Sequence, residues 1–298
     1  MSSNMHFVDV KSILTANSGM NGMNIYRGCT HGCIYCDSRS TCYRFTHRFE
    51  DVEVKRNAPE LLERELRSKR KVCMIGTGAM SDPYMHCEKE LMLTRKCGEV
   101  ILKHGFGFAV QTKSDLIMRD IDLLDEINRT AKCVVQMTLT VYDDRLCSII
   151  EPNVCNTRRR IEVLEAMRRR NIPTVVWLSP VLPFINDTAD NIQAILEACA
   201  GVQVKGIVCF GMGLTLREGD REYYYEALDR HFPGLKERYI RTYGNAYEIP
   251  SPDNARLMKL FGDFCLSRGI LYKPDDCFRF MNQLPERFRQ ISFLDGET

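Results

Sequence analysis

Three cysteines stand close together near the start of the chain, at a spacing that suits a metal centre. Cys29, Cys33 and Cys36 form the pattern C-x3-C-x2-C, and Gly28 and Gly32 beside them let the loop fold tightly around a bulky group. A structural zinc site normally has four protein ligands, and a [4Fe-4S] cluster normally takes four cysteines. Three thiolates would leave one iron of such a cluster open to a non-protein ligand, which is a feature of a catalytic centre.

Two neighbouring residues leave alternatives open. Cys42 follows Cys36 by six residues, and as a fourth ligand it would close the site and make it structural. The alternative function is then a non-catalytic iron–sulfur or zinc module. His31, inside the loop, is either a ligand or a residue that tunes the cluster through hydrogen bonds.

Length and composition describe the kind of protein that holds this loop. The chain has 298 residues, a net charge of +2 and 44% hydrophobic residues, which suits one large α/β domain or two small ones. Fourteen cysteines are too few for a disulfide scaffold in a chain this long. The first ten residues lack the pattern of a secretory signal, and no apolar run reaches the roughly 18 residues of a membrane span. We therefore expect a cytoplasmic protein with no membrane partner.

Short apolar runs alternate with amphipathic helical patterns along most of the chain. Six runs are predicted as buried parallel strands: Met23–Arg27, Val72–Thr77, Phe108–Thr112, Cys133–Thr140, Thr174–Leu178 and Gly206–Phe210. Six strand–helix units are too few for a closed eight-fold barrel. They predict an α/β fold with a helical C-terminal region, either a partial (β/α)6 TIM-like barrel or a doubly wound sheet. We expect an N-terminal segment at 1–20, a core at 21–215 and a helical extension at 216–298 packed on it.

The helical patterns carry further expectations. Ile161, Leu164 and Met167 form one apolar stripe, and the arginines at 158–160 and 168–170 are interpreted as the solvated outer face of that helix. Ser251 and Pro252 are expected to begin a helix that runs to about residue 268.

The cysteine loop resembles that of the radical S-adenosylmethionine (SAM) superfamily, including the aromatic Tyr35 before the third cysteine. Within the superfamily, the chain resembles the spore photoproduct lyase-like branch, often labelled DNA repair photolyase. The matching stretches are Asn24–Cys29, Gly32–Cys36, Thr77–Tyr84, Thr112–Ser114, Glu151–Pro152 and Pro180–Pro183. The similarity covers about residues 20 to 210.

The resemblance implies a cofactor set and a reaction. Cys29, Cys33 and Cys36 would bind three irons of a [4Fe-4S] cluster, and SAM would chelate the fourth. Reductive cleavage of SAM would give a 5′-deoxyadenosyl radical that abstracts hydrogen from the substrate. Reduced flavodoxin or ferredoxin is the expected electron donor. The residues carried over as SAM contacts are Ser81, Asp82, Lys113 and Thr138, each near the carboxyl end of a predicted strand.

One departure from the branch bears on the substrate. Spore photoproduct lyases carry a hydrogen-donor cysteine two residues before the serine matched here by Ser81, and this chain has Ala79 there. This argues against repair of spore photoproduct, although a DNA lesion lyase is kept as an alternative. The sequence identifies no catalytic residue, and a nucleic acid, a peptide or a small metabolite stays open as substrate.

Overall fold

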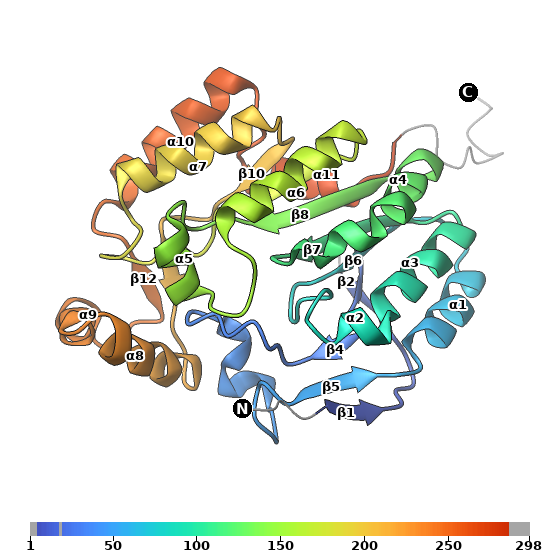
Figure 1. Cartoon of the computed structure of the whole chain (residues 1–298), viewed down its shortest axis with the longest axis horizontal. Helices are drawn as coiled ribbons and strands as arrows, with labels where there is room; N and C mark the ends of the chain where they lie inside the picture. The colour runs from blue at the N-terminus through green and yellow to red at the C-terminus, as the bar shows by residue number, and fades with distance from the viewer. Residues whose placement is uncertain (1–4, 18–19, 286–298) are drawn as a thin grey trace, which may run out of the picture.

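The computed structural model describes residues 5–17 and 20–285, and its centre is a sheet of seven strands. The strand order is β10-β9-β8-β7-β6-β3-β2, and the six strands from β10 to β3 run parallel (Figure 1). The bounds are β2 Leu14–Asn17, β3 Met20–Met23, β6 Met74–Thr77, β7 Gly107–Thr112, β8 Cys133–Thr138, β9 Thr174–Trp177 and β10 Gly206–Val208. The two outermost strands do not pair, so within the described part of the chain the barrel is open, as the sequence predicts.

The first predicted strand is in fact two short strands in different sheets. The chain leaves the main sheet after Met23 and resumes pairing at β4 (Tyr26–Arg27), which runs antiparallel to β5 (Val52–Lys55). At the switch, the carbonyl oxygens of Asn24 and Ile25 accept hydrogen bonds from the side chain and backbone of Lys55, at 2.6 and 3.1 Å. The prediction of one continuous strand was therefore wrong, because a run of apolar residues does not record which strand it pairs with.

Helices cover one face of the sheet and bury its apolar side chains. Ile75, Phe108, Val135 and Val176 point from successive strands into this layer and are at most 1% exposed. The helices that follow the strands are α1 Ala58–Ser68, α2 Glu88–Leu91, α3 Leu93–Lys103, α4 Ile121–Thr130, α5 Asp144–Ile150, α6 Thr157–Arg169 and α7 Ala189–Gly201. This is the helix-covered parallel sheet that continuous apolar strands require.

The opposite face is covered at one end by the C-terminal helix α11 (Pro274–Asn282). The strand residues next to those that face the helices point to this second face. Among them, Ala109, Val134 and Val175 pack with Cys277 and Met281 of α11. Because successive strand residues point to opposite faces, the two packing clusters lie on the two sides of one sheet. In a closed barrel this second face would be the interior.

The C-terminal part also contains a two-stranded sheet of β11 (Gly213–Thr215) and β12 (Glu248–Pro250). Around it lie α8 Asp220–His231, α9 Leu235–Tyr243 and α10 Asn254–Arg268, and α8 contacts the short turn that follows the cysteine loop (Figure 1). The helix predicted from Ser251 begins at Asn254, three residues later, and the Ser251 hydroxyl accepts from the Asp253 amide at 3.1 Å and donates to Asp187. The boundaries at residues 20 and 215 stay predictions. No helix in the described residues is long and apolar enough to cross a membrane.

Candidate radical SAM site

All seven residues predicted to bind the cluster or SAM line one cavity at the carboxyl ends of the parallel strands. The three cysteines come from the loop after β4, and the other residues come from the ends of β6, β7 and β8. We call this space the cluster cavity. Its lining contains Cys29, Cys33, Cys36, Ser81, Asp82, Lys113 and Thr138 together with His31, Tyr35 and the segment from Gly78 to Met80.

The thiols of the loop are buried beside one another. Cys29 and Cys33 are 8% and 6% exposed. Burial raises the pKa of Cys29 to about 12 and also raises the pKa of Cys33 and Cys36 above that of a free cysteine. Buried thiolates without a positive partner are unfavourable, so a metal centre would stabilise the charged form that metal binding requires.

The three thiols do not form a preformed site for a single ion. Within residues 5–17 and 20–285, no three Cys, His, Asp or Glu side chains converge closely enough to hold one metal ion. Zinc bonds of about 2.3 Å would bring tetrahedral sulfur ligands to within about 3.8 Å of one another. The arrangement instead surrounds a space that several elements line.

Cys42 lies apart from the other three cysteines of the loop region. It is exposed, it does not line the cluster cavity, and its sulfur accepts a hydrogen bond from Arg217 Nη1 at 3.4 Å. The structure therefore places only Cys29, Cys33 and Cys36 at the cavity.

Asp82 organises the cavity wall with its carboxylate. Oδ1 accepts from the Thr112 hydroxyl at 2.7 Å and from the Tyr84 amide at 2.9 Å, while Oδ2 accepts from the Lys113 amide at 2.8 Å. Nδ1 of the buried His31 lies 3.4 Å from Oδ2. Burial lowers the pKa of His31 to about 4, although Asp82 opposes the change, so the ring is neutral at pH 7. Asp82 thus joins the ends of β6 and β7 to the cysteine loop.

Two polar groups at the cavity have no hydrogen-bond partner among the described residues. Ser81 Oγ is buried and unpaired, and the Lys113 ammonium makes no hydrogen bond or ion pair. Burial alone would lower the pKa of Lys113, but attraction to Cys33 and Glu151 raises it above its ordinary value. A hydroxyl and a fixed positive charge are thus available to a polar ligand with an anionic group, as the amino-acid end of SAM has.

A buried ion pair fixes the cysteine loop from behind. Glu151 and Arg160 are 2% and 0% exposed, with Oε2 and Nη1 2.5 Å apart, and the Tyr35 hydroxyl donates to Glu151 Oε1. Arg160 also donates to the carbonyl oxygen of Thr138 at 3.1 Å. The interpretation of Arg160 as part of a solvated face was wrong. The available signal was its spacing, since it lies four and seven residues before Leu164 and Met167 on the buried stripe.

Glu88 is a second buried carboxylate, and it is among the residues that match the spore photoproduct lyase-like branch, although the sequence gives it no role. It is 0% exposed and accepts from the amides of Leu93 and Thr94 at 3.2 and 3.0 Å. It also pairs with Arg119 at 3.1 Å and accepts from the Tyr26 hydroxyl. Glu88 therefore ties the strand that precedes the cysteine loop to the helical layer.

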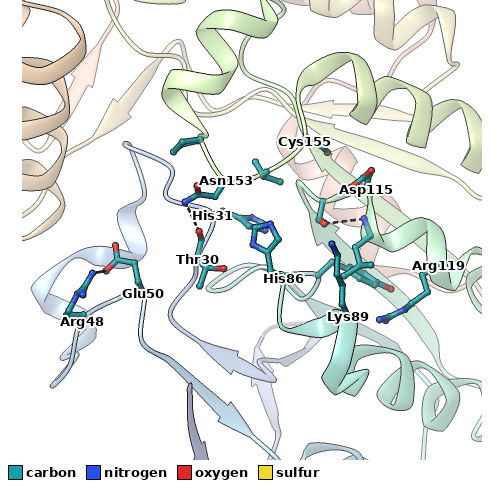
Figure 2. A pocket seen from close by; sticks show the side chains of 15 residues that line it. Thr30, His31, Arg48, Glu50, His86, Lys89, Asp115, Arg119, Asn153 and Cys155 are labelled. Atoms are coloured by element: carbon teal, nitrogen blue, oxygen red, sulfur yellow. Dashed lines mark hydrogen bonds and ion pairs between the residues drawn. The ribbon is translucent and has the colours of Figure 1, made fainter. Parts of the chain in front are cut away.

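Two larger cavities adjoin the cluster cavity. The outer hollow, of about 980 Å³, shares His31 with it and lies outside the loop, where Figure 2 shows His31 beside His86, with Arg48 and Glu50 to one side and Lys89 and Arg119 to the other. The mouth cavity, of about 590 Å³, shares five residues with it, among them Tyr35, Cys36 and Ala79. Although the outer hollow is larger, the mouth cavity shares more of the cluster cavity's wall and one of the three cysteines.

Comparisons with known proteins agree with this site and fold. The sequence model described as the radical SAM superfamily matches residues 23–199. An uncharacterized protein of Mycobacterium tuberculosis is 29% identical over 76% of this chain and 68% of its own. A protein of Pseudomonas phage M6 named radical SAM Nalpha-GlyT isomerase is 26% identical over 58% of this chain and 35% of its own.

Among solved structures, variants of spore photoproduct lyase share the fold. One of them superimposes with a TM-score of 0.60 at 11% identity, over 85% of this chain and 75% of the other. A second, with AdoMet and dinucleoside spore photoproduct bound, has a TM-score of 0.57 at 12% identity over the same shares. At this identity the similarity is one of fold.

Proposed function

Because this chain belongs to the radical SAM superfamily, we propose that it binds a [4Fe-4S] cluster through Cys29, Cys33 and Cys36 and uses SAM for radical chemistry on a bound substrate. The bound cluster and SAM supply reductive cleavage of the sulfonium and a radical that abstracts hydrogen. The observation that carries the proposal is the convergence of all seven predicted residues on one cavity, from a loop and three strand ends that are far apart in sequence.

The residues of the cavity fit these two groups. Three buried thiols supply ligands for three irons, and Cys42 is not placed to supply a fourth. Lys113 holds a positive charge toward the carboxylate of SAM, and the unpaired Ser81 hydroxyl and Thr138 offer hydrogen bonds. Asp82 keeps Lys113 and His31 in position through the contacts described above.

Buried contacts hold the cysteine loop against the sheet. The buried ion pair between Glu151 and Arg160 holds Tyr35 and the end of β8 together, so the loop keeps its shape beside the sheet. Ala79 lines both the cluster cavity and the mouth cavity, so no thiol hydrogen donor stands at this position. The proposed reaction is therefore hydrogen abstraction from a substrate other than spore photoproduct, with a reduced flavodoxin or ferredoxin as electron donor.

The test uses two cysteine variants that differ in position but not in chemistry. The protein is reconstituted anaerobically with iron and sulfide and then given dithionite and SAM. We expect 5′-deoxyadenosine from the wild type and from Cys42→Ala, and none from Cys29→Ala, with iron content and the cluster absorbance measured in each. Wild-type deoxyadenosine yield from Cys29→Ala, or loss of the cluster in Cys42→Ala, would refute the assignment.

A further inference from the structure

The mouth cavity has negative charge and no positive charge among the residues that line it. The structure describes nineteen lining residues, and none of them is Lys, Arg or His. The two charged residues are Asp37, which follows the third cysteine of the loop, and Glu248 on β12. A ligand that enters next to the cluster cavity therefore meets carboxylates.

The two carboxylates differ in how far they are already paired. Asp37 accepts from the Tyr43 hydroxyl at 3.0 Å and lies 3.6 Å from Arg217 Nε. Glu248 is exposed, and its carboxylate makes no hydrogen bond or ion pair with any described residue. Glu248 thus presents an uncompensated negative charge to the cavity, while the charge of Asp37 is partly balanced.

The rest of the wall is largely apolar. Phe210, just after β10, is 62% exposed, although its ring stacks on Phe278 with centroids 6.1 Å apart. Met212 and Leu214 continue this wall. An exposed aromatic face inside a cavity offers contact to an apolar part of a ligand.

SAM does not account for this charge. None of the four proposed SAM contacts lines the mouth cavity, since Ser81, Asp82, Lys113 and Thr138 face the cluster cavity only. The mouth cavity therefore offers space for a second ligand, the substrate.

We propose that the mouth cavity binds a substrate that carries a protonated amine next to an apolar group, with the amine at Glu248 and the apolar group on Phe210. This rests on the proposed function, because it names the substrate class of the same site. A nucleic acid strand needs lysine and arginine for its phosphates, and the described lining offers none. The inference thus favours a cationic amine over a DNA lesion.

The test compares three probes on the reconstituted protein, without reductant, so that no turnover occurs. N-acetyl-Phe-Lys-amide and N-acetyl-Phe-Glu-amide share the same backbone and aromatic group and carry opposite charges, and thymidylyl-thymidine represents DNA. Dissociation constants are measured by calorimetry with and without SAM. We expect the lysine probe to bind about two- to fivefold more tightly than the other two, as an ion pair with an exposed carboxylate allows.

Three variants identify the group responsible. Glu248→Gln should weaken binding of the lysine probe about two- to fivefold and leave the affinity for SAM unchanged. Glu248→Lys should reverse the preference toward the glutamate probe. Glu126→Gln, an exposed glutamate on α4 that lines none of the three cavities, should bind all ligands like the wild type.

Several results would overturn the inference. Thymidylyl-thymidine could bind most tightly, or the two peptides could bind equally well. Glu248→Gln could bind the lysine probe as tightly as the wild type does, or it could lose as much affinity for SAM as for the lysine probe. If the proposed function is wrong, the protein will neither bind SAM nor form 5′-deoxyadenosine. The relative affinities of the three probes, measured without SAM, test the inference about the mouth cavity independently of that result.

Discussion

Glu151→Gln is the substitution that tests most directly how the cysteine loop is supported. The wild-type carboxylate lies 2.5 Å from Arg160, both side chains are at most 2% exposed, and Tyr35 donates to the second oxygen. Glutamine keeps the shape of the side chain and removes only its charge. The arginine is then left buried with no counter-charge.

The size of the effect follows from that burial. Removing one partner of a buried ion pair costs about 3–5 kcal/mol, because the remaining charge keeps its desolvation penalty. With an unfolding entropy of about 2.1 cal/mol/K per residue, this lowers Tm by about 5–8 °C for a chain of 298 residues. We expect a fall of that size by differential scanning calorimetry, together with reduced iron uptake on reconstitution.

The matched control is Glu165→Gln in helix α6. Glu165 also pairs with two arginines, Arg168 at 2.7 Å and Arg169 at 3.1 Å, but its side chain is 26% exposed and both arginines face solvent. Water and salt screen such pairs, so its Tm should change by less than about 1 °C. Equal shifts in the two variants would refute the reasoning that burial makes the Glu151 pair important.

The effect should also depend on pH. Burial would raise the pKa of Glu151, but the positive charges of Arg160 and Lys113 outweigh it and hold the pKa below its ordinary value. A carboxyl group with a lowered pKa stabilises the fold above its unfolded pKa, about 4.3, and loses this as the pH falls through the folded value. The difference in Tm between wild type and Glu151→Gln should therefore be full at pH 7 and shrink below about pH 4.

Three further predictions concern other positions. Gly78→Ala should strongly destabilise the cavity wall, because φ is +104° and a Cβ would lie 2.1 Å from the Gln111 carbonyl oxygen. Gly105→Ala is the control: φ is +69° but the space around it is open, so it should cost only about 1 kcal/mol when both variants are compared by urea unfolding. Burial raises the pKa of Asp220 to about 6, so the contribution of this carboxyl group to stability should fall as the pH rises from about 4 to 6. Asp220→Asn should therefore be more stable than wild type by about 2–3 kcal/mol at pH 7 but not at pH 4, measured by urea unfolding. Lys113→Met should weaken SAM binding about tenfold or more with the cluster retained, measured by equilibrium dialysis, and unchanged affinity would remove Lys113 from the site.

Most of the parallel strands and the cysteine loop could be predicted because both are recorded locally. Fully apolar runs of four to six residues predict buried parallel strands, and β6 and β8 are buried along their whole length. The spacing of Cys29, Cys33 and Cys36 within eight residues places three thiols in one loop whatever the rest of the chain does. Residues at the carboxyl ends of parallel strands meet at one edge, so Ser81, Lys113 and their partners could be expected together.

Other features depend on contacts between residues far apart in the chain, and only the tertiary structure decides them. Tyr35 and Glu151 are 116 residues apart, and nothing near either one shows that they meet in a buried hydrogen bond. The spacing of Arg160 marks it as the arginine of its run on the buried side of α6, but only the structure shows that it forms a buried ion pair with Glu151 there. Likewise, Glu248 reaches the mouth cavity only because β12 pairs with β11. Sequence patterns report the surroundings of a residue along the chain, whereas the charge balance of a cavity is a sum over segments that folding brings together.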